Sequence, residues 1–403
     1  MASIRVALAQ LNFCLGDFES NVASITEAYD RALEREADVV VFSELAVCGY
    51  PPEDLLLKQR FLEDARAALE DVAAHTSNAV AVVGFPEQDG ERIYNSAAVC
   101  HQGAVTGIYR KQLLPNYSVF DEKRYFTPGV SAGPIFQIAG VMVGISICED
   151  QWFDEGPLND QIASGVGLAI SLNASPYQRG KDAARASTVI ERVTSHKIPV
   201  VYVNQVGGQD ELIFDGSSFV ANSEGELIAR LPQFEEAVQI VDLDVDECDS
   251  GELPVIVTSK KQKKKGEIAE PVVAEVDDPI AEVWNALVLA TRDYVNKNGF
   301  SEVVIGLSGG VDSSLVAAIA VDALGPERVH GVSMPSRYSS QGSEDDAAEL
   351  ARNFGIDFQT IPIEAGYTAL TDMLESVFRG HSADLTEENL QSRLRGILLM
   401  AMS

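Results

Sequence analysis

The stretch VMVGISICEDQW, residues 141–152, joins an apolar run to an abrupt polar end. The run from Val141 to Ile147 is short and rich in β-branched residues, which predicts a buried β-strand. It ends at Cys148, which two acids and a tryptophan follow closely. A cysteine at this place is either a small core residue, the commoner case for this residue type, or a nucleophile presented at the tip of a strand.

Similar runs recur through the first 250 residues and alternate with amphipathic helical patterns. Strands are predicted over 4–11, 37–44, 79–85, 96–101, 167–173 and 199–205, and helices over 21–36, 60–75 and 182–196. A hairpin is expected over 219–231, around Ser223 to Gly225. The pattern is α/β, with enough strands for two sheets.

The character of the sequence changes after Asp249. We expect a first domain over 1–250, a linker over 251–278, with prolines and a lysine cluster from Lys260 to Lys265 on a solvated face, and a second domain over 279–403. In the second domain, strands at 302–308, 328–335 and 356–363 alternate with helices, which predicts a parallel, doubly wound, Rossmann-like sheet. The chain stops at Ser403 within an apolar helical pattern, so we expect this domain to be incomplete.

Composition limits the partners. The formal net charge of −31 argues against nucleic acid and anionic membranes as partners. No apolar run reaches membrane-spanning length, and the N-terminus shows no secretory signal. The five cysteines (Cys14, Cys48, Cys100, Cys148 and Cys248) are odd in number and form no CxxC pair, which argues against a disulfide framework or zinc site. We expect a cytoplasmic protein.

The segment GLSGGVDSS, residues 306–314, lies between a predicted strand and a predicted helix. Its glycines allow backbone amides to approach a phosphate, and a helix N-terminus favours an anion. It is not a Walker A loop, because Asp312 rather than lysine precedes Ser313. An acid repels phosphate unless Asp312 holds Mg²⁺ that bridges to it. The alternative is a plain Gly-rich turn with a serine cap.

Three phrases in the first domain carry a second candidate site. SELAVCGYPPEDLL, YRKQLLPNYSVFDEKRYF and GISICEDQW each follow or end a strand-like run and contribute Glu44, Lys111 and Cys148. A thiol nucleophile needs a base and a donor for the oxyanion, which a glutamate and a lysine can supply. Taken singly, Glu44 could cap a segment, Lys111 could be a surface charge and Cys148 could be core. A Cys148–His196 pair is a further alternative, although a histidine near a helix end is commonly bound by helix carbonyls.

The loop at 306–314 resembles the pyrophosphatase loop of the ATP pyrophosphatase superfamily, and 333–356 with 387–396 resemble NAD synthetases in particular. This resemblance implies an ATP site at Gly306, Leu307, Ser308, Gly309, Gly310, Val311, Asp312 and Ser313, Mg²⁺ at Asp312, and deamido-NAD contacts at Asn389 and Arg393.

The phrases around Glu44, Lys111 and Cys148 resemble the nitrilase superfamily over residues 3–245, in particular the glutaminase domains of glutamine-dependent NAD synthetases. The resemblance implies a four-layer αββα sandwich, a Glu44–Lys111–Cys148 triad, and glutamine contacts at Tyr117, Phe120, Glu149, Ser175 and Lys181. It further implies a homo-oligomeric ligase that takes ammonia from glutamine and uses ATP to amidate deamido-NAD. Two rival interpretations are a glutaminase with a non-functional synthetase remnant and a non-catalytic nucleotide-binding module.

Overall fold

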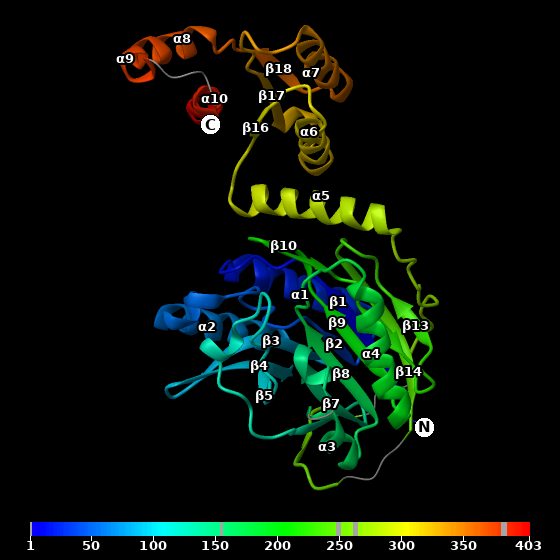
Figure 1. Cartoon of the computed structure of the whole chain (residues 1–403). Coiled ribbons are helices and arrows are strands. Elements are labelled where there is room, and N and C mark those ends of the chain that lie inside the picture. The colour runs from blue at the N-terminus through cyan, green and yellow to red at the C-terminus, as the bar shows by residue number, and fades with distance from the viewer. Residues whose placement is uncertain (1, 154–155, 247–250, 261–264, 380–384) are drawn as a thin grey trace. The chain divides into compact units, whose positions relative to one another are not determined.

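A computed structural model describes residues 2–153, 156–246, 251–260, 265–379 and 385–403 (Figure 1). Tertiary contacts divide the chain into two units, Met1–Ala286 and Leu287–Ser403, and helix α5 (Pro279–Lys297) runs through the division. Cys248, residues 247–250 at the expected end of the first domain, and residues 261–264 of the lysine cluster lie outside the described residues. Each unit is described by itself.

The first unit contains two large sheets. Over the described residues, the first sheet has six strands in the order β14-β1-β2-β3-β4-β5. These strands are β1 (Ala2–Gln10), β2 (Val39–Val41), β3 (Val80–Asp89), β4 (Arg92–His101), β5 (Ala104–Arg110) and β14 (Ala237–Val245). β1, β2 and β3 run parallel, and β14, β4 and β5 pair antiparallel at the two sides.

The second sheet has seven described strands in the order β13-β12-β9-β8-β7-β6-β15. These strands are β6 (Ile135–Ile138), β7 (Val141–Ile147), β8 (Leu168–Asn173), β9 (Val200–Asn204), β12 (Phe219–Ala221), β13 (Leu227–Arg230) and β15 (Val255–Val257). β7, β8 and β9 run parallel, and β12 and β13 form the predicted hairpin. β15 belongs to the stretch expected as linker and pairs with β6.

Alternating side chains place each sheet between two apolar layers. Val6 and Leu8 of β1 join Val143 and Ile170 of the second sheet in one buried core, because successive residues of a strand face opposite sides. The outer faces are covered by helices α1 (Phe18–Glu34) and α2 (Gln59–His75) on the first sheet, and by α3 (Leu158–Ala163) and α4 (Lys181–His196) on the second (Figure 1). The four-layer αββα sandwich is confirmed.

The second unit is a parallel α/β fold, as predicted. Its described strands are β16 (Val303–Gly306), β17 (Val329–Ser333) and β18 (Asp357–Thr360), all parallel in the order β16-β17-β18. The helices are α6 (Val311–Leu324), α7 (Gln341–Phe354), α8 (Glu364–Met373), α9 (Glu375–Phe378) and α10 (Leu385–Met402). α6 and α7 contribute to one core and α10 to another, so both faces of the sheet are covered.

Two further strands matter for the site. β10 (Val206–Gln209) and β11 (Leu212–Asp215) form a separate antiparallel pair in the first unit.

Within the described part of the chain, no helix combines the length and apolar character that crossing a bilayer requires.

Candidate active site

Glu44, Lys111 and Cys148 stand just beyond the ends of three strands. Glu44 follows β2, Lys111 directly follows β5, and Cys148 directly follows β7. Two of these strands belong to the first sheet and one to the second. The packing of one sheet on the other therefore brings together side chains that are far apart in the sequence.

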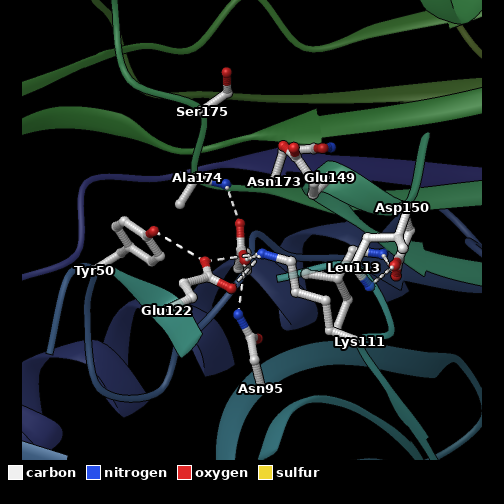
Figure 2. Close-up of polar contacts among 12 residues, drawn as sticks. Tyr50, Asn95, Lys111, Leu113, Glu122, Glu149, Asp150, Asn173, Ala174 and Ser175 are labelled. Carbon is white, nitrogen blue, oxygen red and sulfur yellow. Dashed lines mark hydrogen bonds and ion pairs between the residues drawn. The ribbon is translucent and has the colours of Figure 1, made fainter. Parts of the chain in front are cut away.

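Lys111 lies at the centre of a buried ion cluster. Its Nζ donates to Glu44 Oε1 at 2.7 Å and to the two carboxylate oxygens of Glu122 at 2.9 and 2.8 Å (Figure 2). The side chains of Lys111, Glu44 and Glu122 are 0%, 1% and 5% exposed. A buried ammonium is tolerated only when it is paired, so the two carboxylates account for this cation. The surface-charge interpretation of Lys111 is wrong.

Glu44 is held by three donors rather than capping a segment. Besides Lys111, the side-chain amide of Asn95 donates to Oε1 at 2.8 Å and the backbone N–H of Ala174 donates to Oε2 at 2.9 Å. Gly84 lets the backbone of β3 lie close to the segment that contains Glu44, because a Cβ at Gly84 would overlap the backbone of Leu45. The carboxylate is therefore fixed by both sheets.

Cys148 is both a core residue and a cavity residue. It is 3% exposed, lies at the end of the apolar layer between the sheets, and lines a cavity of about 370 Å³. Its φ of 45° is rare for any residue other than glycine. Such a strained backbone persists only where the surroundings impose it, and it is common at functional sites.

Asp150 ties the turn of Cys148 to the segment of Lys111. Its carboxylate accepts hydrogen bonds from the backbone N–H groups of Ile147, Gln112 and Leu113, and from the hydroxyl of Tyr109. Figure 2 shows Asp150 next to Leu113. Asp150 is buried, and its bonds to Tyr109 and Ile147 are buried with it. The relative position of Lys111 and Cys148 is set through this one carboxylate.

The buried charges change the ionisation of the cluster. Burial opposes the charged form of Lys111, but Glu122 and Glu44 outweigh it and raise the pKa of Lys111 well above its usual value. Burial, and after it the charge of Glu44, raise the pKa of the Cys148 thiol despite Lys111. Burial also raises the pKa of Glu122, against the opposing charge of Lys111. Lys111 is thus a permanent cation, and Cys148 rests as a neutral thiol that needs a base.

The five residues expected to contact glutamine line the same cavity as Cys148. They are Tyr117, Phe120, Glu149, Ser175 and Lys181. The hydroxyl of Tyr117 donates to both oxygens of Glu149 at 2.9 and 3.0 Å, and Lys181 Nζ donates to the carbonyl of Pro176 at 3.1 Å. The cavity therefore carries a carboxylate and an ammonium beside a thiol, a set that suits a small zwitterion.

The alternative pair of Cys148 and His196 is wrong. His196 is exposed and is the last residue of α4, whereas the first residue of that helix, Lys181, lines the cavity. At 1.5 Å per residue, the helix separates its two ends by roughly 22 Å. The position of His196 at the far end of α4 removes it from the thiol.

Glu122 and Asp150 are two residues of the first site that sequence reasoning missed. Glu122 begins the short helical turn Glu122–Arg124 and is surrounded in sequence by Asp121, Lys123 and Arg124, a pattern typical of an exposed turn. Both residues lie inside the phrases that contain Lys111 and Cys148. An acidic residue within such a phrase is the signal by which the sequence could have indicated them.

The loop after β16 forms the second candidate site. Gly309 has a φ of 78°, and a Cβ there would overlap the carbonyl oxygen of Ser343. The Ser308 hydroxyl lies 3.0 Å from that of Ser313 and accepts from the Gly310 N–H at 3.2 Å. Of the predicted ATP residues, Gly306, Leu307 and Ser308 line a cavity of about 540 Å³. Gly309, Gly310, Val311, Asp312 and Ser313 continue from it into the first turn of α6.

The predicted deamido-NAD residues on α10, Asn389 and Arg393, do not line that cavity. Asn389 and Arg393 are exposed on α10, four residues apart and so on one face. The neighbouring face of α10 contributes Ser392, Arg395, Gly396 and Leu399 to the lining of the cavity. Arg395 Nε donates to the carbonyl of Met334 at 3.0 Å. Arg395 is a cavity cation that the sequence did not single out.

Family models match both units. Residues 5–251 match the carbon–nitrogen hydrolase family and residues 283–403 match the NAD synthase family. A buried thiol with a carboxylate and an ammonium in the first unit, and a phosphate-type loop in the second, define a carbon–nitrogen hydrolase joined to an NAD synthase domain.

Relatives of known function cover the whole chain. A glutamine-dependent NAD(+) synthetase of Thermotoga maritima is 45% identical over 100% of this chain and 73% of its own length, and one of Aquifex aeolicus is 42% identical over 99% and 73%. The chain belongs to the family of glutamine-dependent NAD(+) synthetases, ATP-dependent ligases with glutamine as the amide donor.

Solved structures agree with this assignment. The glutamine-dependent NAD+ synthetase of Acinetobacter baumannii, in complex with ADP, is similar over 100% of this chain and 72% of that chain, with a TM-score of 0.88 and 41% identity. A Nesterenkonia amidase of the nitrilase superfamily is similar over 60% of this chain and 90% of its own, with a TM-score of 0.54 and 26% identity.

Proposed function

We propose that Cys148 releases ammonia from glutamine and that the second unit uses this ammonia, with ATP, to convert deamido-NAD to NAD. The observation that carries the first half is the buried Lys111–Glu44 pair at 2.7 Å beside a cavity that contains the thiol. The membership of the family carries the second half.

The glutaminase reaction follows from the chemistry of the three groups. Cys148 Sγ attacks the side-chain amide carbon of glutamine while its proton passes to Glu44, because the neutral thiol cannot attack efficiently without a base. Lys111 stabilises the oxyanion of the tetrahedral intermediate. Glu44 returns the proton to the leaving nitrogen, ammonia departs, and a thioester remains. Glu44 then takes a proton from water as the water oxygen attacks the thioester carbon, the C–S bond breaks, glutamate leaves, and Glu44 returns the proton to the Cys148 thiolate.

A solved relative supports the covalent step. An amidase from Nesterenkonia, 25% identical to this chain, has a structure that shows covalent addition of an acetamide moiety at its active-site cysteine. In the present cavity, Lys181 suits the α-carboxylate of glutamine and Glu149 suits its α-ammonium, with Tyr117, Phe120 and Ser175 as the remaining contacts. Opposite charges at the two ends orient the amide toward Cys148.

The second unit supplies the acyl-activating reaction. The loop from Gly306 to Ser313 binds the phosphates of ATP through backbone amides and the N-terminus of α6. The carboxylate of deamido-NAD attacks the α-phosphorus, pyrophosphate leaves, and ammonia then displaces AMP to give NAD. Asn389 and Arg393 contact deamido-NAD. A cytoplasmic, homo-oligomeric enzyme completes the proposal.

Mg²⁺ fits the donors near the loop. Mg²⁺ is held in many nucleotide sites by one or two carboxylates and the substrate phosphates, and Asp312 lies exposed in the first turn of α6 next to Ser313. Asp312 would hold the ion, which when bound would neutralise charge on the phosphates.

A comparison of two nitrogen sources tests the proposal. Cys148→Ala should abolish NAD formation from deamido-NAD with glutamine and leave formation with ammonium chloride unchanged. Cys100→Ala, a fully buried cysteine in β4, is the matched control and should retain both. Loss of both reactions in Cys148→Ala, with the control active, would contradict the two-site proposal.

A further inference from the structure

The backbone of Ser175 is held by one buried side chain. Asn204, at the end of β9, accepts the N–H of Ser175 at 2.9 Å, and its own amide group lies 3.5 Å from the carbonyl oxygen of Ser175. Asn204 is fully buried. A single side chain that addresses both the donor and the acceptor of a residue fixes the orientation of its peptide groups.

Asn204 in turn contacts a backbone carbonyl and an ion cluster. Its amide donates to the carbonyl of Gly216 at 3.0 Å and lies 3.4 Å from Asp215 Oδ1. Asp215 receives both arms of the Arg185 guanidinium, at 3.0 and 2.7 Å, and Arg185 also donates to Asp182 at 3.0 Å. The side chains of Arg185 and Asp215 are 1% and 2% exposed. A bidentate, solvent-free pair of this kind has one well-defined geometry.

The same cluster fixes the start of α4. Asp182 directly follows Lys181 in that helix, Arg185 lies one turn after Lys181, and Asp215 ends β11. Lys181 Nζ donates to Pro176, the residue after Ser175. Two cavity residues, Ser175 and Lys181, therefore take their positions from one buried network that does not itself line the cavity.

The network is separate from the support of the triad. Glu44 is bound by the N–H of Ala174, one residue before Ser175 (Figure 2), and by Asn95 and Lys111. Loosening Asn204 thus releases Ser175 while Ala174 stays attached to Glu44. This separation allows glutamine recognition and thiol chemistry to be changed independently.

We propose that Asn204, Asp215 and Arg185 are positioning residues that set the affinity for glutamine by fixing Ser175 and Lys181. The inference rests on the proposed glutaminase function of the cavity. A network of this kind contributes to affinity because the ordering of the two contact residues is complete before the substrate binds.

Two substitutions test the network. Arg185→Lys keeps the charge and removes the fork that binds both oxygens of Asp215, and Asn204→Asp keeps an acceptor for Ser175 but replaces the donor with an oxygen near Asp215. The expected result is a rise of about tenfold in the KM for glutamine, with kcat and the rate of Cys148 alkylation by iodoacetamide within about threefold of the wild type.

Arg5→Lys is the matched control. Arg5 is also buried and bidentate, to Asp242 at 2.7 and 2.9 Å, but it belongs to β1 and does not line the cavity. Arg5→Lys should lower the melting temperature in the same way and leave the KM for glutamine unchanged. Where Arg185→Lys or Asn204→Asp fails to fold, Asp215→Asn, which keeps shape and loses charge, takes its place.

Several outcomes would overturn the inference. They are an unchanged KM in the folded variants, an equal rise in Arg5→Lys, or a fall in alkylation rate that parallels the change in KM. A wild-type chain that hydrolyses no glutamine would instead reject the proposed function, and the positioning role with it. Hydrolysis by the wild type with an unchanged KM in the variants rejects the positioning role alone.

Discussion

Lys111 Nζ lies 2.7 Å from Glu44 Oε1, and both side chains are almost completely removed from solvent. Glu122 binds the same ammonium from another side. The cluster holds one cation between two carboxylates, so each member depends on the others for its burial. A second substitution that removes a carboxylate can therefore restore stability to a variant without Lys111, although it cannot restore the activity that needs the cation.

Removing the cation should cost both stability and activity. Lys111→Met leaves the carboxylates of Glu44 and Glu122 buried without their cation, which we expect to lower the free energy of unfolding by about 3–5 kcal/mol and to abolish glutamine hydrolysis. The double variant Lys111→Met with Glu122→Gln removes one of the stranded charges. It should recover part of the stability in urea titrations and none of the activity. Full activity in either variant would contradict the role of Lys111 at the oxyanion.

The Cys148 thiol should ionise late. Because burial and the charge of Glu44 raise the pKa of Cys148 well above its usual value, the thiolate fraction stays small through neutral pH and rises only at alkaline pH. The rate of iodoacetamide alkylation of Cys148, followed by peptide mass spectrometry, should still be increasing above about pH 9, whereas a free cysteine is half-ionised near about pH 8.5. A midpoint below that of the free cysteine would count against this ionisation order.

A side chain at Gly309 should disrupt the phosphate loop. Gly309→Ala adds a Cβ that overlaps Ser343 and forces an L-residue to a φ of 78°. Gly299→Ala is the control, because Gly299 has a similar φ of 74° and open space around it. Gly309→Ala should weaken ATP binding by about tenfold or more in calorimetry while glutamine hydrolysis persists, and Gly299→Ala should cost only about 1 kcal/mol of stability. Equal ATP affinity in the two variants would show that the loop does not carry the site.

The carboxylate of Asp312 should matter only with metal present. Asp312→Asn keeps the shape of the residue and removes the charge that suits Mg²⁺. We expect ATP affinity in the presence of Mg²⁺ to fall by about tenfold and affinity in the presence of EDTA to stay unchanged or rise, since an acid repels the free phosphate. Asp322→Asn, an exposed acid near the other end of α6, should change neither value. A loss that is equal with and without Mg²⁺ would assign Asp312 a purely structural role.

Much of the fold followed from local pattern. The strand run ending at Ile147, the hairpin of β12 and β13, and the parallel order β16-β17-β18 are all present, because alternation and length are written in contiguous residues. Short strands such as β6 and β15 escaped prediction. β15 pairs with β6, which lies more than a hundred residues earlier in the chain. The three residues of β15 are too few to show the alternation that predicts a strand.

The sequence by itself determined which residue types stand at the strand ends. These are a carboxylate, an ammonium and a thiol in three recognisable phrases, and a Gly-rich turn before a helix. Only the tertiary structure decided their partners. It placed Glu122 on Lys111, Asp150 between the two strand ends, and His196 at the far end of α4. The reason is physical: strand propensity is a local property, whereas the burial and pairing of a charge depend on surfaces that meet only when the two sheets pack.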